Sequence, residues 1–238
     1  MTLLADPQVW VSFLTLTVLE IVLGIDNIVF ISIIVAKLPE DQAKRARQIG
    51  LGLALVFRIL LLMALSYIIG LTRPVITLQE QVFSWRDLVL IGGGLFLLWK
   101  ATREIHQDIE GEPDVLASGA KAAFGAIIVQ IIVIDMIFSI DSIITAVGIA
   151  DHVEVMIAAV IIAVIIMYAA SGPIAGFITD NPTTKMLALA FLMLIGVALI
   201  ADGFGLHIPR GYIYFAMAFS GMVELFNILA KKRRREGS

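Results

Sequence analysis

Four acidic residues lie inside long apolar stretches of this 238-residue chain. They fall in two similar motifs, each with an acid, five mostly apolar residues, an aspartate and a small polar residue: Glu20, Asp26 and Asn27, then Asp135, Asp141 and Ser142. A carboxylate at the centre of a membrane helix costs on the order of 2.5–3.5 kcal/mol. Four of them at matched positions therefore predict an ion or proton site, with these six residues as ligands of a metal cation.

Carboxylates, an amide oxygen and a hydroxyl form a hard ligand set made only of oxygen, which suits Mn²⁺, Mg²⁺ and Ca²⁺. The chain has no cysteine, and none of its three histidines lies well inside an apolar stretch, so zinc and copper(I) are not expected. Paired acids in a low dielectric hold a proton when no cation is bound. We therefore expect exchange of protons for a divalent cation, which is the substrate, and no permanent cofactor.

The elements that must position these acids are membrane helices. The chain is 60% hydrophobic and only 16% charged, whereas a soluble domain is about a quarter charged. Seven apolar runs can be counted: Trp10–Val35, Gln48–Leu71, Leu88–Ala101, Ala122–Ala150, Val155–Ile178, Met186–Ala201 and Gly211–Ala230. The predicted fold is an all-α membrane protein with seven transmembrane helices in a single transmembrane domain.

The placement of Lys and Arg residues predicts the orientation of the chain. Most of them fall in the segments after the first, third, fifth and seventh runs, and the chain ends in the basic tail 231–238. Arg73, Arg86 and Arg210 fall on the other side. Because cytoplasmic loops carry an excess of Lys and Arg, the N-terminus is predicted to lie outside and the C-terminus in the cytoplasm.

The recurrence of the acid motif predicts an inverted repeat. Three spans form repeat one, about residues 10–105, and three form repeat two, about 120–205, with a seventh helix at about 209–230. Three is an odd number, so the second repeat enters the membrane upside down, as in many secondary transporters. The third spans also match, since Leu90–Leu95 resembles Leu194–Leu199, and both runs look short and interrupted by glycine, a pattern that points to a binding site.

The inverted arrangement predicts which acids meet. Six helical residues rise about 9 Å, so each motif places its two acids at different depths. Opposite helix directions then pair Glu20 with Asp141 and Asp26 with Asp135. Unwinding at Gly24 would instead gather the ligands into one cage, and the sequence leaves both one site and two open.

Two further charged residues are candidates for supporting roles. Arg58 is the basic residue well inside a span, and we expect it to form a salt bridge with an acid such as Glu224. A buried pair of this kind could also act as a gate, or as a fixed positive charge that drives a bound cation off. Glu224 itself is as compatible with a solvated acid at the membrane interface as with a residue that supports the ligands.

These features resemble the TerC family of integral membrane proteins, within the LysE-like transporter superfamily. The resemblance covers essentially the whole chain and includes both acid motifs, the Leu-Ile-Gly pattern, and Gly211–Met217 followed by Glu224 and Asn227. The chain is most similar to short members without CBS or CorC-type domains. The resemblance implies a bacterial inner membrane protein whose intramembrane acids serve Mn²⁺ export, or the supply of metal to exported proteins.

The leading prediction is a divalent cation transporter that exports Mn²⁺, with Ca²⁺ or Mg²⁺ as other candidates and protons as the coupling ion. One alternative is an intramembrane aspartyl protease, although here the aspartates follow isoleucine, in Gly-Ile-Asp and Ser-Ile-Asp. Another is a non-transporting membrane partner of stress-response or secretion complexes. We expect a lipid bilayer around the chain, no enzyme activity and no nucleic-acid partner; the oligomeric state stays open, a homo-oligomer included.

Overall fold

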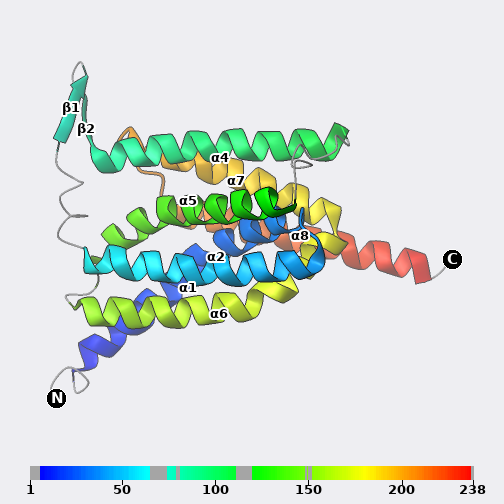
Figure 1. The fold of residues 1–238 in the computed structure, drawn as a ribbon, viewed down its shortest axis with the longest axis horizontal. Coiled ribbons are helices and arrows are strands. Elements are labelled where there is room, and N and C mark those ends of the chain that lie inside the picture. The colour runs from blue at the N-terminus through cyan, green and yellow to red at the C-terminus, as the bar shows by residue number, and fades with distance from the viewer. Residues whose placement is uncertain are drawn as a thin grey trace.

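The structure of the chain, a computed structural model, describes residues 6–64, 74–78, 81–110, 120–147, 149 and 152–236. Its helices lie side by side in one elongated bundle (Figure 1). Within the described residues there are seven helices, α1 Pro7–Val35, α2 Glu40–Met63, α4 Trp85–Glu110, α5 Ala120–Val147, α6 Val153–Asp180, α7 Pro182–Gly203 and α8 Arg210–Glu236. An antiparallel hairpin, β1 Pro74–Leu78 and β2 Gln81–Ser84, precedes α4. Six of these helices are long and apolar enough to cross a membrane, so the predicted all-α membrane fold is confirmed.

The third predicted span, Leu88–Ala101, lies within α4, which continues to Glu110. α4 is not among the six apolar helices, because every stretch of 18 residues within it contains at least three charged side chains. It still runs along the bundle beside α7 (Figure 1). Both α4 and α7 are continuous helices, so the prediction that glycines interrupt these two spans is wrong.

Local sequence signals account for the starts of several helices. The Asp6 carboxylate accepts a hydrogen bond of 2.9 Å from the Gln8 backbone N–H, and Pro7 is the first helical residue of α1. Both features satisfy or remove backbone donors that a helix leaves unpaired at its N-terminus. α2 begins directly after Pro39, and α7 begins at Pro182. The helices therefore start where the prolines between apolar runs indicate.

The directions and contacts of the helices match the geometry of an inverted repeat. α1 and α5 run in opposite directions, and the chain termini lie at opposite ends of the bundle (Figure 1). α1 packs against α6, and α5 packs against α2. These two contacts are equivalent if α1, α2 and α4 correspond to α5, α6 and α7, and the contact of α4 with α7 then lies on the axis relating them. The division into repeats at 10–105 and 120–205 stays a prediction.

Glycines allow the closest of these helix contacts. A Cβ atom on Gly94 of α4 would lie 2.5 Å from the Gly196 carbonyl oxygen of α7. A Cβ atom on Gly24 of α1 would overlap the Met167 Sδ of α6. Small residues of this kind let membrane helices approach each other closely. Gly24 lies inside the unbroken helix α1, so the alternative in which α1 unwinds there is wrong.

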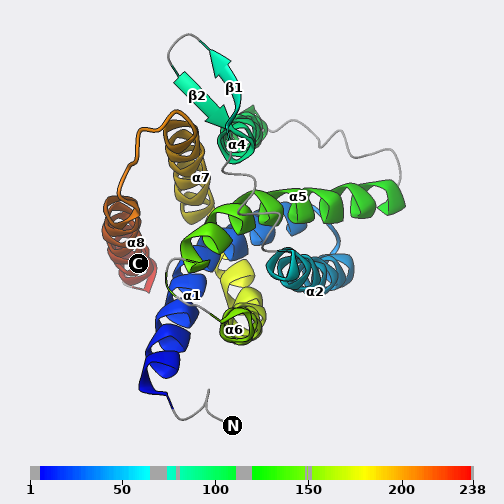
Figure 2. The ribbon, with the colours of Figure 1, turned by 90° about the vertical axis from the view of Figure 1, so that its left-hand side faces the viewer.

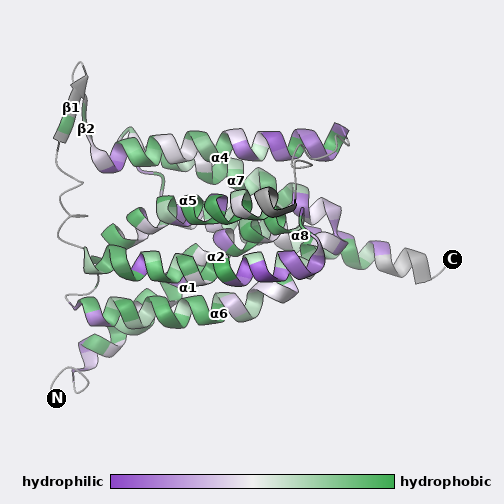
Figure 3. Cartoon of the chain, viewed as in Figure 1, coloured by the Kyte–Doolittle hydropathy of each residue, from purple (hydrophilic) through white to green (hydrophobic). Residues whose placement is uncertain are grey.

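The last helix, α8, lies at the edge of the bundle beside α7 (Figure 2). Only 6% of its most apolar stretch is buried inside the structure, which fits a helix appended to the two three-helix units. Hydrophilic residues gather toward the end of the bundle that holds the C-terminus, on α2 and on the second half of α4 (Figure 3). The lysines and arginines of these stretches, among them Lys44, Arg45, Lys100 and Arg103, belong to the side predicted to be cytoplasmic.

Candidate functional site

One acid of α1 and one acid of α5 are bound to the same arginine of α2. The Arg58 Nη1 lies 2.6 Å from the Glu20 Oε2, and the Arg58 Nη2 lies 2.8 Å from the Asp135 Oδ1. The Arg58 Nε also donates to both Asp135 oxygens, at 3.1 and 3.2 Å. Only 2% of Glu20, 3% of Arg58 and 6% of Asp135 is exposed. α2 places Arg58 here because it packs against both α1 and α5.

Two polar side chains complete this group. The Asn27 Nδ2 donates to the Asp135 Oδ1 at 3.3 Å, and the Ser139 Oγ donates to the Asp135 Oδ2 at 3.2 Å. The Asn27 Oδ1 is buried and has no hydrogen-bond partner among the described residues. We call Glu20, Asn27, Arg58, Asp135 and Ser139 the central cluster. With two carboxylates and one guanidinium, it carries a formal charge of −1.

The predicted pairing of Glu20 with Asp141 is wrong, because Glu20 shares Arg58 with Asp135. Asp26 was predicted to pair with Asp135, but its side chain lies outside the described residues. No group of three or more acids or imidazoles close enough to hold a metal occurs among the described side chains. Two facing carboxylates without a cation repel each other, and Arg58 takes the place of that missing positive charge.

Asp141 lies in a second cluster nearer the end of α5. Its carboxylate forms ion pairs with Arg86 of α4, at 2.6 Å, and with Arg210 of α8. Arg210 also lies 3.4 Å from the Asp202 Oδ2 of α7. We call these four residues the Asp141 cluster. It joins α4, α5, α7 and α8 at the end of the bundle where α4 and α8 begin (Figure 1).

The remaining predicted site residues, Ser142 and Glu224, form no hydrogen bond to the described acids of either cluster. The Ser142 Oγ donates to the Ser139 carbonyl oxygen at 3.3 Å, rather than to a carboxylate. The Glu224 carboxylate accepts a hydrogen bond from the Thr183 hydroxyl of α7. The expectation that Arg58 pairs with Glu224 is therefore wrong, because the arginine is already bound to Glu20 and Asp135.

Two hollows connect the clusters. A cavity of about 20 Å³ is lined by Arg58, Ser142, Arg210 and Tyr214, together with apolar side chains. A volume of this size holds about one water molecule. A groove of about 710 Å³ between α1, α5 and α8 shares Arg210 and Tyr214 with this cavity and reaches Asp141. The small cavity thus lies between the central cluster and a groove that is open beside α8.

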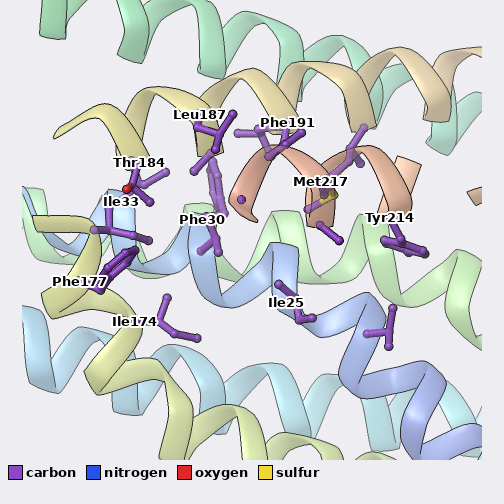
Figure 4. A pocket seen from close by; sticks show the side chains of 18 residues that line it. Ile25, Phe30, Ile33, Ile174, Phe177, Thr184, Leu187, Phe191, Tyr214 and Met217 are labelled. Carbon is purple, nitrogen blue, oxygen red and sulfur yellow. The ribbon is translucent and has the colours of Figure 1, made fainter. Parts of the chain in front are cut away.

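A third hollow is apolar. It has a volume of about 490 Å³ and lies between α1, α6, α7 and α8. Figure 4 shows its lining, with Ile25, Phe30 and Phe191 among the side chains that face it. Of its 18 lining residues only Thr184 and Tyr214 carry a hydroxyl, and the others lack N or O atoms in their side chains. Such a lining offers a hydrated cation almost no ligands.

Several charged residues that pair with buried acids were not predicted from the sequence. Arg86 and Arg210 were used only to predict orientation, although each is a lone arginine at the start of a span on the side predicted for Asp141. A buried carboxylate on α4, Glu104, was also missed. It lies 2.7 Å from the Nζ of both Lys37 and Lys100.

Glu104 lies beyond the predicted third span. Burial alone would raise the pKa of the Glu104 carboxyl, but the hydrogen bonds and charges of Lys100 and Lys37 outweigh burial and leave that pKa below its usual range. The ionised carboxylate therefore ties α4 to the turn that follows α1.

Comparison with known proteins agrees with the architecture and with the motifs. Residues 5–237 match the model of the integral membrane protein TerC family. The chain is 51% identical to the UPF0053 inner membrane protein YgdQ of Escherichia coli strain K12, over 97% of both chains. It is also 51% identical to a UPF0053 protein of Haemophilus influenzae, over 96% of this chain and 97% of that one.

A longer relative shows the same membrane unit within a larger protein. The UPF0053 inner membrane protein YoaE of Escherichia coli strain K12 is 47% identical over 98% of this chain, which corresponds to 45% of YoaE. No solved structure matches the chain. The family match spans nearly every residue, both acid motifs included, and so the chain belongs to the TerC family of integral membrane proteins.

Proposed function

We propose that this protein transports a divalent cation, with Mn²⁺ as the favoured substrate, out of the cytoplasm across the bacterial inner membrane. The observation that carries the proposal is the convergence of Glu20 and Asp135 on one buried point from oppositely directed helices. Intramembrane acids mark ion pathways by default, and a site at the interface of two inverted units is typical of secondary transporters. The names of the relatives support the membrane assignment.

The ligand chemistry of the central cluster suits a hard cation. Glu20 and Asp135 supply carboxylate oxygens, and the buried Asn27 Oδ1 is an amide oxygen without a partner among the described residues. Asp26 precedes Asn27 in the chain and is proposed as a further ligand. Oxygen ligands of this kind bind Mn²⁺, Mg²⁺ and Ca²⁺, and the family resemblance favours Mn²⁺ among them.

The path proposed for the cation continues to the Asp141 cluster. Asp141 and Ser142 lie one to two helical turns beyond Asp135 on α5, and the groove beside α8 reaches Asp141. With the N-terminus outside, this groove lies on the outer half of the protein. The apolar cavity toward the other end would exclude a hydrated cation, so we assign this conformation to a state closed on its cytoplasmic side.

Proton exchange follows from the charge of the central cluster. One carboxylate is left without a counter-charge when Arg58 occupies the site. A proton can neutralise this carboxylate in a low-dielectric interior, and a divalent cation displaces it on binding. We therefore propose protons as the coupling ion. The aspartyl protease alternative has less support, because the buried aspartates Asp135, Asp141 and Asp202 each lie in ion-pair range of an arginine.

Flux measured with the purified protein tests the function directly. We expect liposomes containing the protein to transport Mn²⁺, with Ca²⁺ and Mg²⁺ assayed in parallel. Glu20→Gln and Asp135→Asn should each lower the Mn²⁺ flux at least tenfold, because each removes a ligand charge. Asp108→Asn, at a partly exposed ion pair with Lys185, serves as the control and should match the parent.

Two results would contradict the proposal in different ways. A folded parent that transports none of the three cations removes the transport function. Folded Glu20→Gln and Asp135→Asn variants that transport like the parent would refute the proposed site but not the transport function.

A further inference from the structure

The central cluster raises a question that the acids alone do not answer, namely why a cation site is filled by an arginine. Arg58 donates from Nε, Nη1 and Nη2 and contacts both acids at 2.6 to 3.2 Å. Its fork thus binds the same oxygens that a metal would use. Arg58 thereby holds together two acids from different helices.

Arginine and a divalent cation cannot share these oxygens. Metal–oxygen distances in such sites are about 2.0–2.6 Å, so a cation on Glu20 and Asp135 would lie within a few ångströms of the guanidinium. Two positive charges at that separation repel strongly in a buried site. Cation binding therefore requires Arg58 to leave at least one of the two carboxylates.

A small cavity beside Arg58 leaves room for its guanidinium to shift. The water-sized cavity of about 20 Å³ adjoins Arg58 on the side of Ser142 and Tyr214, and it shares its far wall with the groove beside α8. A guanidinium that shifts in this direction approaches the hydroxyls of Ser142 and Tyr214 but also Arg210, so the space suits a short shift off one carboxylate and not a move to Asp141. The apolar cavity is not lined by Arg58, and its lining carries only the hydroxyls of Thr184 and Tyr214.

We infer that Arg58 is a tethered competitor of the transported cation, which holds the two carboxylates when the site is empty, yields them when the cation binds, and displaces the cation on release. This inference rests on the proposed function. It assigns Arg58 a role in setting affinity and turnover, beyond the role of a residue that stabilises the fold. A transporter needs a site that binds well enough to load and weakly enough to unload, and an internal counter-charge provides the second property.

The test compares Mn²⁺ binding and Mn²⁺ flux in Arg58→Met, Arg58→Lys and Arg103→Met proteins. Arg58→Met removes the competitor, so the Kd for Mn²⁺ should fall at least tenfold while the maximal flux also falls, because release is slower. Arg58→Lys keeps the charge but cannot bridge two carboxylates with a planar fork, and should have an intermediate Kd. Arg103 stacks on Trp99 at the exposed surface of α4, so its variant should match the parent.

A purely structural role for Arg58 predicts the opposite pattern. In that case Arg58→Met and Arg58→Lys bind Mn²⁺ with the affinity of the parent or more weakly, and this result overturns the inference. If Arg58→Met unfolds in the absence of metal, the melting temperature with and without Mn²⁺ replaces the Kd. A larger Mn²⁺ stabilisation than in the parent supports the inference, and an equal or smaller one contradicts it.

Arg58→Lys decides the question if Arg58→Met does not fold under any condition. A Kd below that of the parent then supports competition, and an unchanged or higher Kd refutes it. The proposed function fails separately, through a parent that neither binds nor transports Mn²⁺, Ca²⁺ or Mg²⁺.

Discussion

The ion pairs of the central cluster predict a large and specific loss of stability when Arg58 is replaced by methionine. The change keeps most of the side-chain volume and leaves Glu20 and Asp135 buried without a positive charge. Removing one partner of a buried ion pair costs about 3–5 kcal/mol. We expect the free energy of unfolding of Arg58→Met to fall by about this amount at neutral pH.

A double-mutant cycle with Asp135→Asn isolates the pair. In the Asp135→Asn background Arg58 keeps only Glu20 as a charged partner. Replacing Arg58 there should therefore lower the free energy of unfolding by less than it does in the parent. Hydrogen bonds to charged groups contribute about 1.5–3 kcal/mol, and Arg58 makes three of them to Asp135. An asparagine at this position keeps one acceptor oxygen for Arg58, so the cycle reports the loss of about one such bond, and we expect a coupling free energy of about 1.5–3 kcal/mol between Arg58 and Asp135. Denaturant titration in detergent micelles, without divalent cations, measures all four proteins.

The ion pair between Lys185 and Asp108 provides the matched control. Its Nζ–Oδ1 distance is 2.6 Å, but its side chains are 24% and 29% exposed. Pairs in contact with solvent contribute about 0–1 kcal/mol, so a Lys185→Met and Asp108→Asn cycle should give a coupling within that range. A coupling between Arg58 and Asp135 no larger than this control value would refute the buried bridge and the geometry of the site with it.

Two further predictions concern packing and pH. Gly94→Ala should lower the free energy of unfolding by about 1–3 kcal/mol, because the added Cβ atom would press against the backbone of α7 at Gly196. Gly92→Ala is the control: nothing lies within 4 Å of its Cβ atom, so its free energy of unfolding should equal that of the parent or be slightly higher. Glu104 has a lowered pKa, so its ion pairs stabilise the fold above about pH 4.3, its unfolded value, and are lost as pH falls through the lower folded pKa. The stability difference between the parent and Glu104→Gln should thus be constant from pH 7 to 5 and shrink below about pH 4, and a difference that shrinks already between pH 7 and 5 would contradict this assignment.

Most of the helical architecture was predictable, because apolar runs and prolines are local signals. The predicted run Trp10–Val35 corresponds to α1, and Val155–Ile178 lies within α6. The length of α4 was underestimated, since its second half is charged and carries no hydropathy signal. The hairpin before α4 was not predicted. These errors arise where the polarity of a residue does not determine its secondary structure.

The partners of the acids were not predictable from depth alone. A rise of about 9 Å between the acids of a motif suggested two levels, but one carboxylate from each level lies within 2.8 Å of the same guanidinium. Arg58 therefore brings together Glu20 and Asp135, which were assigned to different levels. The reasoning paired carboxylates with each other, although two buried carboxylates are stable together only with a cation or a proton between them. An arginine inside a span needs counter-charges, and this need, applied to Arg58, indicates an ion pair with the acids of both motifs.

Charge and burial together favour the central cluster over the Asp141 cluster as the proposed cation site. The Asp141 cluster has two carboxylates and two guanidiniums, and a third carboxylate, Asp87, lies 3.9 Å from Arg86; the side chains of Arg86 and Arg210 are 19% and 30% exposed, so solvent screens these charges. In the central cluster Glu20 and Asp135 face a single arginine, and the side chains of all three are at most 8% exposed. An unbalanced negative charge in a dry interior is costly unless a proton or a cation neutralises it. Under the proposed function, the central cluster is therefore the place where a cation gains most by binding, and the more exposed Asp141 cluster beside the groove is suited to pass the ion on.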